Sequence, residues 1–401
     1  MTFGGLLRTL WLGIAAFVVA ISLIGYAASS PPAGAASKGP LKIGMLCACS
    51  GPEASSIGIS DEVFQAWGKY VNSLGGINGQ KVQITVMDDT DNPTTSVDDA
   101  EKLISQDHVT VLADNTNVDT GWAKYAQQHK VPVVGIITNS SEMYSNPDFF
   151  PEGQTQQSVN TAEAYAAKKV GGTKLALMYC AEAAVCAEGV APLKTAAASI
   201  GVPLVYDTSI TYDAPNYTAQ CLAAKQAGAD VLWIAQAVSA TLAAGNSCLL
   251  QGYTPIELDD DGGITAAVLN APAFNNHIIS VQPDMPFSVT STPGMKNMYA
   301  QLKKFDPNAL TPANLGAEVQ QTWATGALIQ AAAKSGGSAT SADFINGLYT
   351  LHNATLGGLT TPLTYARGKG HPINCWFYLR VQNGKFTTPY GLKAVCHTPI
   401  Q

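Results

Sequence analysis

The chain has 401 residues and a formal net charge of −7, and only 13% of its residues are charged. This length favours two domains over one, and a hydrophobic fraction of 46% is sufficient for a full core. The acidic balance and the lack of a lysine or arginine stripe exclude a basic nucleic-acid-binding surface, so we expect no nucleic-acid partner.

Residues 1–36 are predicted to be a signal peptide or an N-terminal anchor. Arg8 precedes an apolar run from Leu10 to Ala28, and the small residues Ala33–Ala35 form a pattern typical of a cleavage site. An uncleaved anchor is the alternative, because the apolar run approaches the length of a bilayer span. Under either interpretation the protein is exported to the periplasm or the cell surface, and an anchor would tether it there.

The folded part of the chain is expected to open with a βαβ unit. The apolar run Leu41–Leu46 predicts a strand, and a loop of small residues leads from it into a helix. The glycine-rich turn Gly75–Gly79 stops that helix, and the β-branched run Val82–Val86 predicts a second strand, which leads into Asp88-Asp89. The apolar face of the helix is formed by Val63, Trp67, Tyr70, Val71 and Leu74.

Strand and helix patterns alternate along the rest of the chain, which predicts parallel sheets covered by helices on both faces. Asn383-Gly384 predicts the turn of a closing hairpin. The expected strands are Val109–Ala113, Val131–Ile137, Leu175–Tyr179, Pro203–Tyr206 and Val231–Ala235. The expected helices are Ser96–Ser105, Trp122–Gln128, Ser158–Val170, Val190–Ser199, Tyr217–Ala227, Ala240–Gln251, Asn297–Phe305 and Leu315–Ala333.

The sequence carries no recognised catalytic or metal-binding motif. The patterns GxSxG, HExxH and GxxxxGK[ST] are absent, and the six histidines are scattered without ligand spacing. We therefore expect a binding protein rather than an enzyme, with no cofactor and no metal. A secreted hydrolase is the alternative class, since a catalytic triad assembles in space and not along the chain.

The opening βαβ unit resembles that of a known family. The turn Gly75–Gly79, which reads GGING, lies between a helix ending at Asn72 and a strand followed by two aspartates, as in the leucine/isoleucine/valine-binding family of type I periplasmic binding proteins. The resemblance covers most of the mature chain. It implies an α/β fold with two Rossmann-like lobes, whose parallel sheets are joined by a three-segment hinge.

The resemblance also implies a function. Such a receptor binds a small solute, an amino acid or a related polar or organic molecule, between its lobes and delivers it to the membrane permease of an ABC importer. We expect it to work as a monomer. The alternative on the same fold is a sensor that reports its ligand to a signalling partner.

By the same resemblance, the chain crosses between the lobes three times. Stretches with Gly or Pro beside extended residues suggest crossings near Pro151–Gly153, Val281–Phe287 and Gly357–Leu363. The first lobe would then comprise residues 41–152 and 286–360, and the second lobe residues 153–285 and 361–401.

Ligands of parallel α/β sheets bind beyond the carboxyl ends of the strands, where helix N-termini offer unpaired N–H groups. In the first lobe this rule selects Ser50, Thr116, Asn117, Thr138 and Asn139. By the resemblance, Thr116 and Thr138 would hold the carboxylate of an amino acid. Because Ser, Thr and Asn are also the preferred N-cap residues, helix capping is the alternative role.

In the second lobe the same rule selects Glu182, Val185, Cys186, Gln236 and Asp261. Cys186 and Gln236 stand where the amino-acid binders of the family carry aromatic residues that stack on the ligand, and this departure argues against a leucine-like ligand. Asp261 stands where the family presents an acid to the ammonium group of its ligand. A solvated turn is the alternative role for Asp261, because its Asp and Gly neighbours favour turns.

Eight cysteines in an exported chain imply disulfide bonds. Their order among the predicted elements pairs Cys180 with Cys186, Cys221 with Cys248 and Cys375 with Cys396, each within one lobe. Cys47 and Cys49 are left over. They share one face of an extended segment, so they either close a bond of distorted geometry or stay as small, buried or partly reduced cysteines.

Overall fold

The structure is a computed structural model that describes most of the chain in stretches separated by short gaps. The described residues are 39–51, 53–135, 140–182, 184–260, 262–275, 277–337 and 339–400. The predicted signal peptide or anchor lies outside them, and so do three predicted ligand-binding residues, Thr138, Asn139 and Asp261. Among the described residues, no helix combines the length and the apolar character that a membrane crossing requires.

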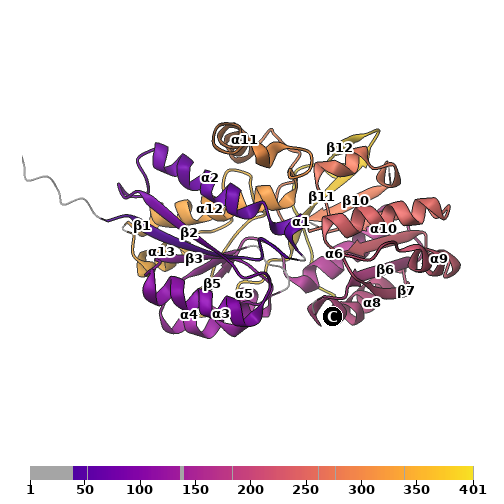
Figure 1. Cartoon of the computed structure of the whole chain (residues 1–401), viewed down its shortest axis with the longest axis horizontal. Coiled ribbons are helices and arrows are strands. Elements are labelled where there is room, and N and C mark those ends of the chain that lie inside the picture. The colour runs from indigo at the N-terminus through magenta and orange to yellow at the C-terminus, as the bar shows by residue number, and fades with distance from the viewer. Residues whose placement is uncertain are drawn as a thin grey trace, which may run out of the picture. The chain divides into compact units, whose positions relative to one another are not determined.

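The first lobe is built on a five-stranded, wholly parallel sheet in the order β2-β1-β3-β4-β5 (Figure 1). Successive residues of a strand point to opposite faces of the sheet. Ile43 and Met45 therefore enter one hydrophobic cluster, whereas Leu46 enters another, and both faces need a cover of helices. The strands are β1 (Leu41–Cys47), β2 (Val82–Asp88), β3 (Val111–Asn115), β4 (Val133–Gly135) and β5 (Phe149–Pro151).

Two groups of helices cover this sheet. One face packs against α3 (Pro93–Glu101), α4 (Ala123–Gln128) and α5 (Ser141–Ser145). The other face packs against α2 (Ser60–Ser73), which follows the short α1 (Ala54–Ile57), and against three helices from much later in the chain. These later helices are α11 (Pro293–Phe305), α12 (Ala317–Gly336) and α13 (Ser341–Leu348).

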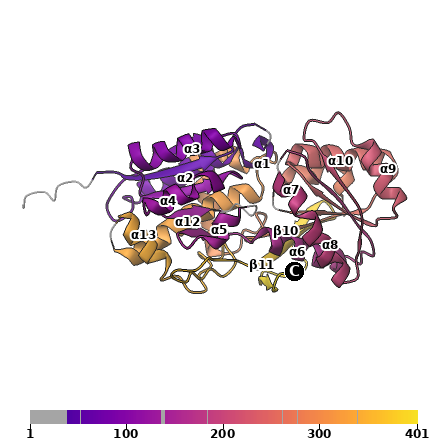
Figure 2. The same ribbon diagram turned by 90° about the horizontal axis from the view of Figure 1, so that it is seen from below.

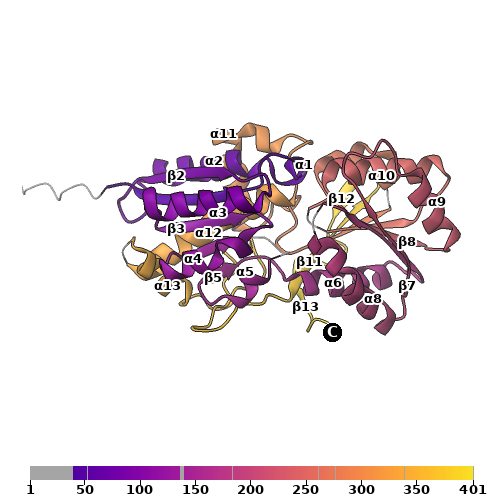
Figure 3. The same cartoon turned by 60° about the horizontal axis from the view of Figure 1, so that its bottom comes forward.

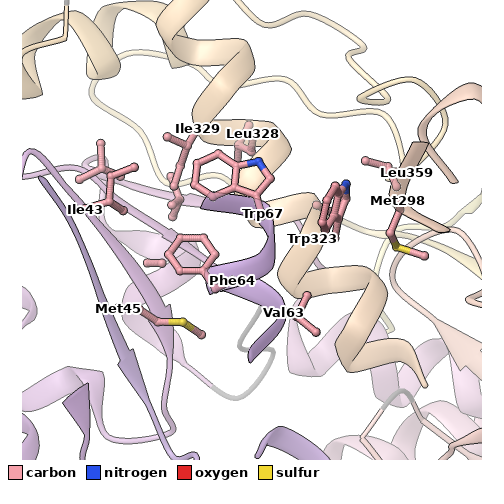
Figure 4. Packing of buried hydrophobic residues seen from close by; sticks show 14 of the residues in the cluster. Ile43, Met45, Val63, Phe64, Trp67, Met298, Trp323, Leu328, Ile329 and Leu359 are labelled. Carbon is pink, nitrogen blue, oxygen red and sulfur yellow. The ribbon is translucent and has the colours of Figure 1, made fainter. Parts of the chain in front are cut away.

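The core between α2 and α12 is dominated by aromatic rings. Trp67 of α2 and Trp323 of α12 are each 1% exposed, and the ring of Phe64 stacks on that of Trp67 (Figure 4). Gly326 of α12 lies directly against Trp67, since a Cβ atom there would come within 2.4 Å of the indole ring. The chain thus returns to the first sheet to complete its core after it has built most of the second.

The second lobe is built on a mixed sheet in the order β12-β11-β10-β9-β8-β6-β7, and β13 pairs with β11. The strands from β10 to β7 in this order are parallel, whereas β11 runs antiparallel to β10. Asn383 and Gly384 join β11 to β12 with φ of 52° and 67°, which confirms the predicted hairpin turn. The strands are β6 (Leu175–Cys180), β7 (Leu204–Ile210), β8 (Val231–Ala235), β9 (Ile256–Asp259), β10 (Ile278–Gln282), β11 (Cys375–Gln382), β12 (Lys385–Thr387) and β13 (Val395–Cys396).

Helices cover both faces of the second sheet as well. Figure 3 shows α6 (Gln156–Lys169) beside α8 (Val190–Ser199), and their apolar side chains form one cluster with the sheet. Figure 2 shows α9 (Thr218–Gln226) beside α10 (Val238–Leu250), which form the other cluster. The short α7 (Ala184–Glu188) follows β6. Together the two sheets and their helices give the predicted α/β fold with two lobes.

The segments that link the two sheets contact one another. Asp284, which follows β10, forms an isolated antiparallel bridge with Thr360. The Tyr365 hydroxyl donates to the Pro151 carbonyl oxygen at 2.7 Å. Glu152 is fully buried beside them, and its carboxylate accepts a hydrogen bond from the Thr325 hydroxyl. These linkers therefore form a packed, hydrogen-bonded bundle of segments.

All eight cysteines are paired in disulfides. The three predicted bonds are present, with Cα atoms 5.7 Å apart in Cys180–Cys186, 5.0 Å in Cys221–Cys248 and 4.1 Å in Cys375–Cys396. The pair left open by the sequence, Cys47 and Cys49, is also bonded. The last predicted bond joins β11 to β13 and so ties the end of the chain to the second sheet.

Candidate functional site

An acidic turn follows β2 at the carboxyl edge of the first sheet. Its backbone is left-handed at two successive residues other than glycine, with φ of 55° at Thr90 and 58° at Asp91. The Asp88 carboxylate accepts a hydrogen bond from the Thr90 N–H, and the Asp89 carboxylate accepts one from the Asp91 N–H. Asn92 then caps α3 through its side-chain oxygen. Hydrogen bonds on both sides thus fix the direction of the Asp91 side chain.

Thr116 and Asn117, two of the predicted ligand-binding residues, hold this aspartate. The Thr116 hydroxyl donates to Asp91 Oδ1 at 3.2 Å, and the Asn117 N–H donates to the same oxygen at 3.0 Å. Asn117 Nδ2 donates to Asp91 Oδ2 at 3.1 Å. Thr116 is fully buried, whereas Asn117 is half-buried. These two residues selected by the strand-end rule are therefore brought together, and they bind a carboxylate of the chain itself.

Ser50, the other described residue selected in the first lobe, lies at the same edge. It is exposed, and its backbone N–H donates to Asp88 Oδ1 at 3.1 Å. The disulfide between Cys47 and Cys49 directly precedes it. Ser50 thus belongs to the acidic turn through its backbone.

In the second lobe, Glu182 and Gln236 form a hydrogen-bonded pair. Gln236 is 6% exposed, and its Nε2 donates to Glu182 Oε2 at 3.0 Å and to the Ile210 carbonyl oxygen at 3.1 Å. The other carboxylate oxygen of Glu182 accepts from the Tyr212 N–H at 2.8 Å. Cys186 is half-buried in α7 and bonded to Cys180, and Val185 lies in the same helix. These polar groups lie at the carboxyl ends of β6, β7 and β8.

Two serines of α1 connect the lobes. Ser56 Oγ donates to the Gly262 carbonyl oxygen and accepts from the Val238 N–H at the start of α10. Ser55 Oγ lies 3.3 Å from Ser239 Oγ and accepts from the Ser239 N–H. The helix α1, which follows β1 in the first lobe, therefore touches the second lobe at Val238, Ser239 and Gly262.

Acidic groups of both lobes act on one another at this edge. The pKa of Glu53 is raised to about 7, first by burial and then by the negative charges of Asp91 in the first lobe and Glu182 in the second. Deeper in the first lobe, burial raises the pKa of Asp119 to about 6, although a hydrogen bond from Ser140 opposes this shift. Among the described residues, no group of three or more potential ligands could hold a metal ion.

Sequence reasoning missed Glu53 and Asp91. The signal for Asp91 was present, because it lies only two residues beyond Asp88-Asp89 in the same turn. The strand-end rule stops at the residues next to each strand, and it does not show which way a left-handed turn directs the following side chain. Glu53 precedes a helix of only one turn, which carries no apolar periodicity.

A cavity of about 220 Å³ lies elsewhere in the first lobe. It is bordered by α2, α11 and α12, and Trp67 and Trp323 are among its walls. Figure 4 shows these two rings in the packed interior. Because none of the strand-end residues that the structure describes lines it, we do not assign it to the predicted solute site.

Comparisons with known proteins agree with this architecture. A family model described as "Periplasmic binding protein" matches residues 40–385. A search of curated proteins finds no match. Among solved structures, the chain is similar to a branched-chain amino acid ABC transporter protein from Thermus thermophilus with bound valine, with a TM-score of 0.80 and 14% identity over 91% of this chain and 98% of that one.

Two further structures have similar folds. A solute-binding protein from R. palustris in complex with benzoate has a TM-score of 0.75 and 18% identity, over 90% of this chain and 99% of that one. A fatty acid ABC transporter substrate-binding protein from Thermomonospora curvata has a TM-score of 0.75 and 15% identity, over 90% and 95%. The family match extends over most of the chain and agrees with the resemblance of the opening βαβ unit. The chain belongs to the periplasmic binding protein family, a family of binding proteins and not of enzymes.

Proposed function

We propose that the chain is the extracytoplasmic receptor of an ABC importer and that it binds a small organic solute between its two lobes. The observation that carries the proposal is the meeting of both lobes at the strand ends, where Ser56 contacts Val238 and Gly262. A solute held there would touch both lobes only when they are together. Its binding energy would then favour the closed form, which is the signal that a permease can read.

The proposed site combines the selected residues of both lobes. We assign the first lobe to residues 41–152 and 286–360, and the second to residues 153–285 and 361–401. The packed linkers around Glu152, Asp284 and Thr360 would serve as the hinge. The proposed ligand-binding residues are Ser50, Thr116, Asn117, Thr138, Asn139, Cys186, Gln236 and Asp261.

The named ligands of structures with this fold support a broad solute class. They include valine, benzoate and a fatty acid. Gln236 is committed to Glu182 and Ile210, and Cys186 is committed to a disulfide. Neither offers the aromatic platform of the amino-acid binders, so we propose a solute other than leucine. The protein would be exported by its N-terminal segment and would act as a monomer.

Mass spectrometry of what co-purifies with the chain, followed by a thermal-shift titration with the identified solute, tests the proposal. We expect a concentration-dependent rise in melting temperature and quantitative recovery of the unchanged solute. Chemical conversion of the solute would instead support the hydrolase alternative. A pull-down with the candidate permease distinguishes import from sensing, and light scattering checks the monomer.

A further inference from the structure

Two of the donors that the strand-end rule selects in the first lobe, Thr116 and Asn117, already hold a carboxylate. Asp91 accepts from the Thr116 hydroxyl, the Asn117 N–H and Asn117 Nδ2, at 3.0–3.2 Å, and both of its carboxylate oxygens are engaged. We infer that Asp91 is an internal substitute for a ligand carboxylate, so that this receptor takes an organic cation without a carboxylate of its own. The inference rests on the proposed function, because it names the solute class of that site.

The position of Asp91 is built into the turn. Thr90 and Asp91 both have left-handed backbones, which are unfavourable for residues other than glycine and above all for a β-branched threonine. Hydrogen bonds to the carboxylates of Asp88 and Asp89 hold the turn from one side, and the Asn92 cap of α3 holds it from the other. The chain thus accepts a strained conformation that directs Asp91 onto Thr116 and Asn117.

A carboxylate solute would meet two obstacles. It would have to displace Asp91 from three hydrogen bonds, and it would then lie beside the negative charge that it displaced. Glu182 of the second lobe adds further negative charge at the same edge, and Glu53 of the first lobe adds more when it is ionised. A cation avoids both obstacles, since it needs no carboxylate subsite and is attracted by the acidic groups of both lobes. Positive charge between Glu53 and Glu182 would also remove the repulsion that opposes closure.

The first test asks whether Thr116 and Asn117 form a carboxylate subsite, and it requires no knowledge of the solute. Asp91→Gly removes the carboxylate and suits the left-handed backbone, so folding is preserved. Thr90→Gly is the matched control, because it relieves the neighbouring strained residue and keeps the carboxylate. We expect 100 mM sodium formate to raise the melting temperature of Asp91→Gly by about 1–2 °C relative to sodium chloride. The parent and Thr90→Gly should show no such rise.

Equal formate shifts in all three proteins, or no shift in a folded Asp91→Gly variant, would overturn the inference.

The second test measures the solute that co-purifies with the parent chain. We expect it to carry an amine or another cationic group and no carboxylate. A carboxylate solute whose affinity is the same in the parent and in Asp91→Gly would also overturn the inference, although the receptor function itself would then stand. Enzymatic conversion of that solute would contradict the receptor function and leave the formate result unaffected.

Discussion

Ser56 accepts a hydrogen bond from the Val238 backbone N–H at 3.2 Å, and this bond joins α1 of the first lobe to the first residue of α10 in the second. The same hydroxyl donates to the Gly262 carbonyl oxygen. The contact uses one side chain and two backbone groups. The Ser56 hydroxyl thus provides a hydrogen-bond partner for an N–H group at the N-terminus of a helix in the second lobe. Without it, that N–H group would need water as its partner.

Ser56→Ala should favour separation of the lobes. It removes two neutral hydrogen bonds, each worth about 0.5–1.5 kcal/mol. We expect the affinity for the co-purifying solute to fall about tenfold, which corresponds to about 1.4 kcal/mol. Calorimetric titration gives the affinity, and small-angle scattering of the ligand-free protein should show a larger radius of gyration.

Ser73→Ala is the matched control for this experiment. Ser73 is an exposed serine of α2 whose hydroxyl donates to the Tyr70 carbonyl oxygen within the same helix. Its loss should leave both the affinity and the radius of gyration unchanged. A Ser56→Ala protein that behaves like Ser73→Ala would show that the α1 contact does not contribute to closure.

Glu53 should make stability depend on pH near neutrality. Its pKa of about 7 in the folded chain lies above its ordinary value, so the folded state binds more protons than the unfolded state between these values. The contribution of Glu53 to the free energy of unfolding is fully present at pH values below the pKa of this group in the unfolded chain. It is lost as the pH rises through about 7. We expect the drop in melting temperature between pH 5.5 and pH 8 to be smaller in Glu53→Gln than in the parent. Glu101→Gln, at an exposed residue of α3, should leave the drop unchanged, and equal drops in all three proteins would contradict this account.

Much of the fold could be predicted from the sequence because its periodic elements are long and uninterrupted. The strands β1, β2 and β8 lie within two residues of their predicted bounds, and α2 ends one residue after the predicted Asn72, since apolar spacing and the glycine-rich turn define them. The three-residue strand β5 and the eight-residue helix α13 were not predicted. Each is too short for its pattern to stand out from that of a loop.

The candidate site could be predicted only in part. The strand-end rule selected Thr116 and Asn117, and the structure does bring them to one place. The rule could not show that the Asp91 carboxylate accepts hydrogen bonds from these two residues, because this contact depends on the left-handed backbone of Thr90 and Asp91. The contact of Ser56 with Val238 spans 182 residues of sequence, and no local pattern encodes such a pairing. Contacts between the lobes follow from the tertiary fold alone.

Gly326→Ala should destabilise the first lobe. A Cβ atom at Gly326 would lie 2.4 Å from the Trp67 ring, which is 1% exposed and cannot move away freely. Overpacking of this kind costs about 1–3 kcal/mol, although alanine is otherwise the better helix former. Urea denaturation measures the free energy of unfolding. Ser335→Ala, at an exposed position of the same helix, is the control and should change it by no more than about 0.5 kcal/mol. Unchanged or increased stability of Gly326→Ala would mean that Trp67 repacks without cost.

Glu152 should tolerate replacement by its neutral isostere. Burial raises its pKa well above the ordinary value, and the nearby negative charge of Asp284 raises it further, so the fold favours the neutral form of the carboxyl group over the charged form. Glu152→Gln keeps the shape and an acceptor for the Thr325 hydroxyl, and we expect its stability at pH 7 to match the parent within about 0.5 kcal/mol. Glu152→Ala should cost about 2–5 kcal/mol, because it leaves a cavity between the linkers and removes that acceptor.

As the pH rises through the raised pKa, the parent should lose stability that Glu152→Gln retains. Urea denaturation of the three proteins at pH 7 and pH 9 measures both effects. If Glu152→Gln is as damaging as Glu152→Ala at pH 7, the buried group carries its charge, and the linkers are held by an ionised carboxylate rather than by a neutral hydrogen bond.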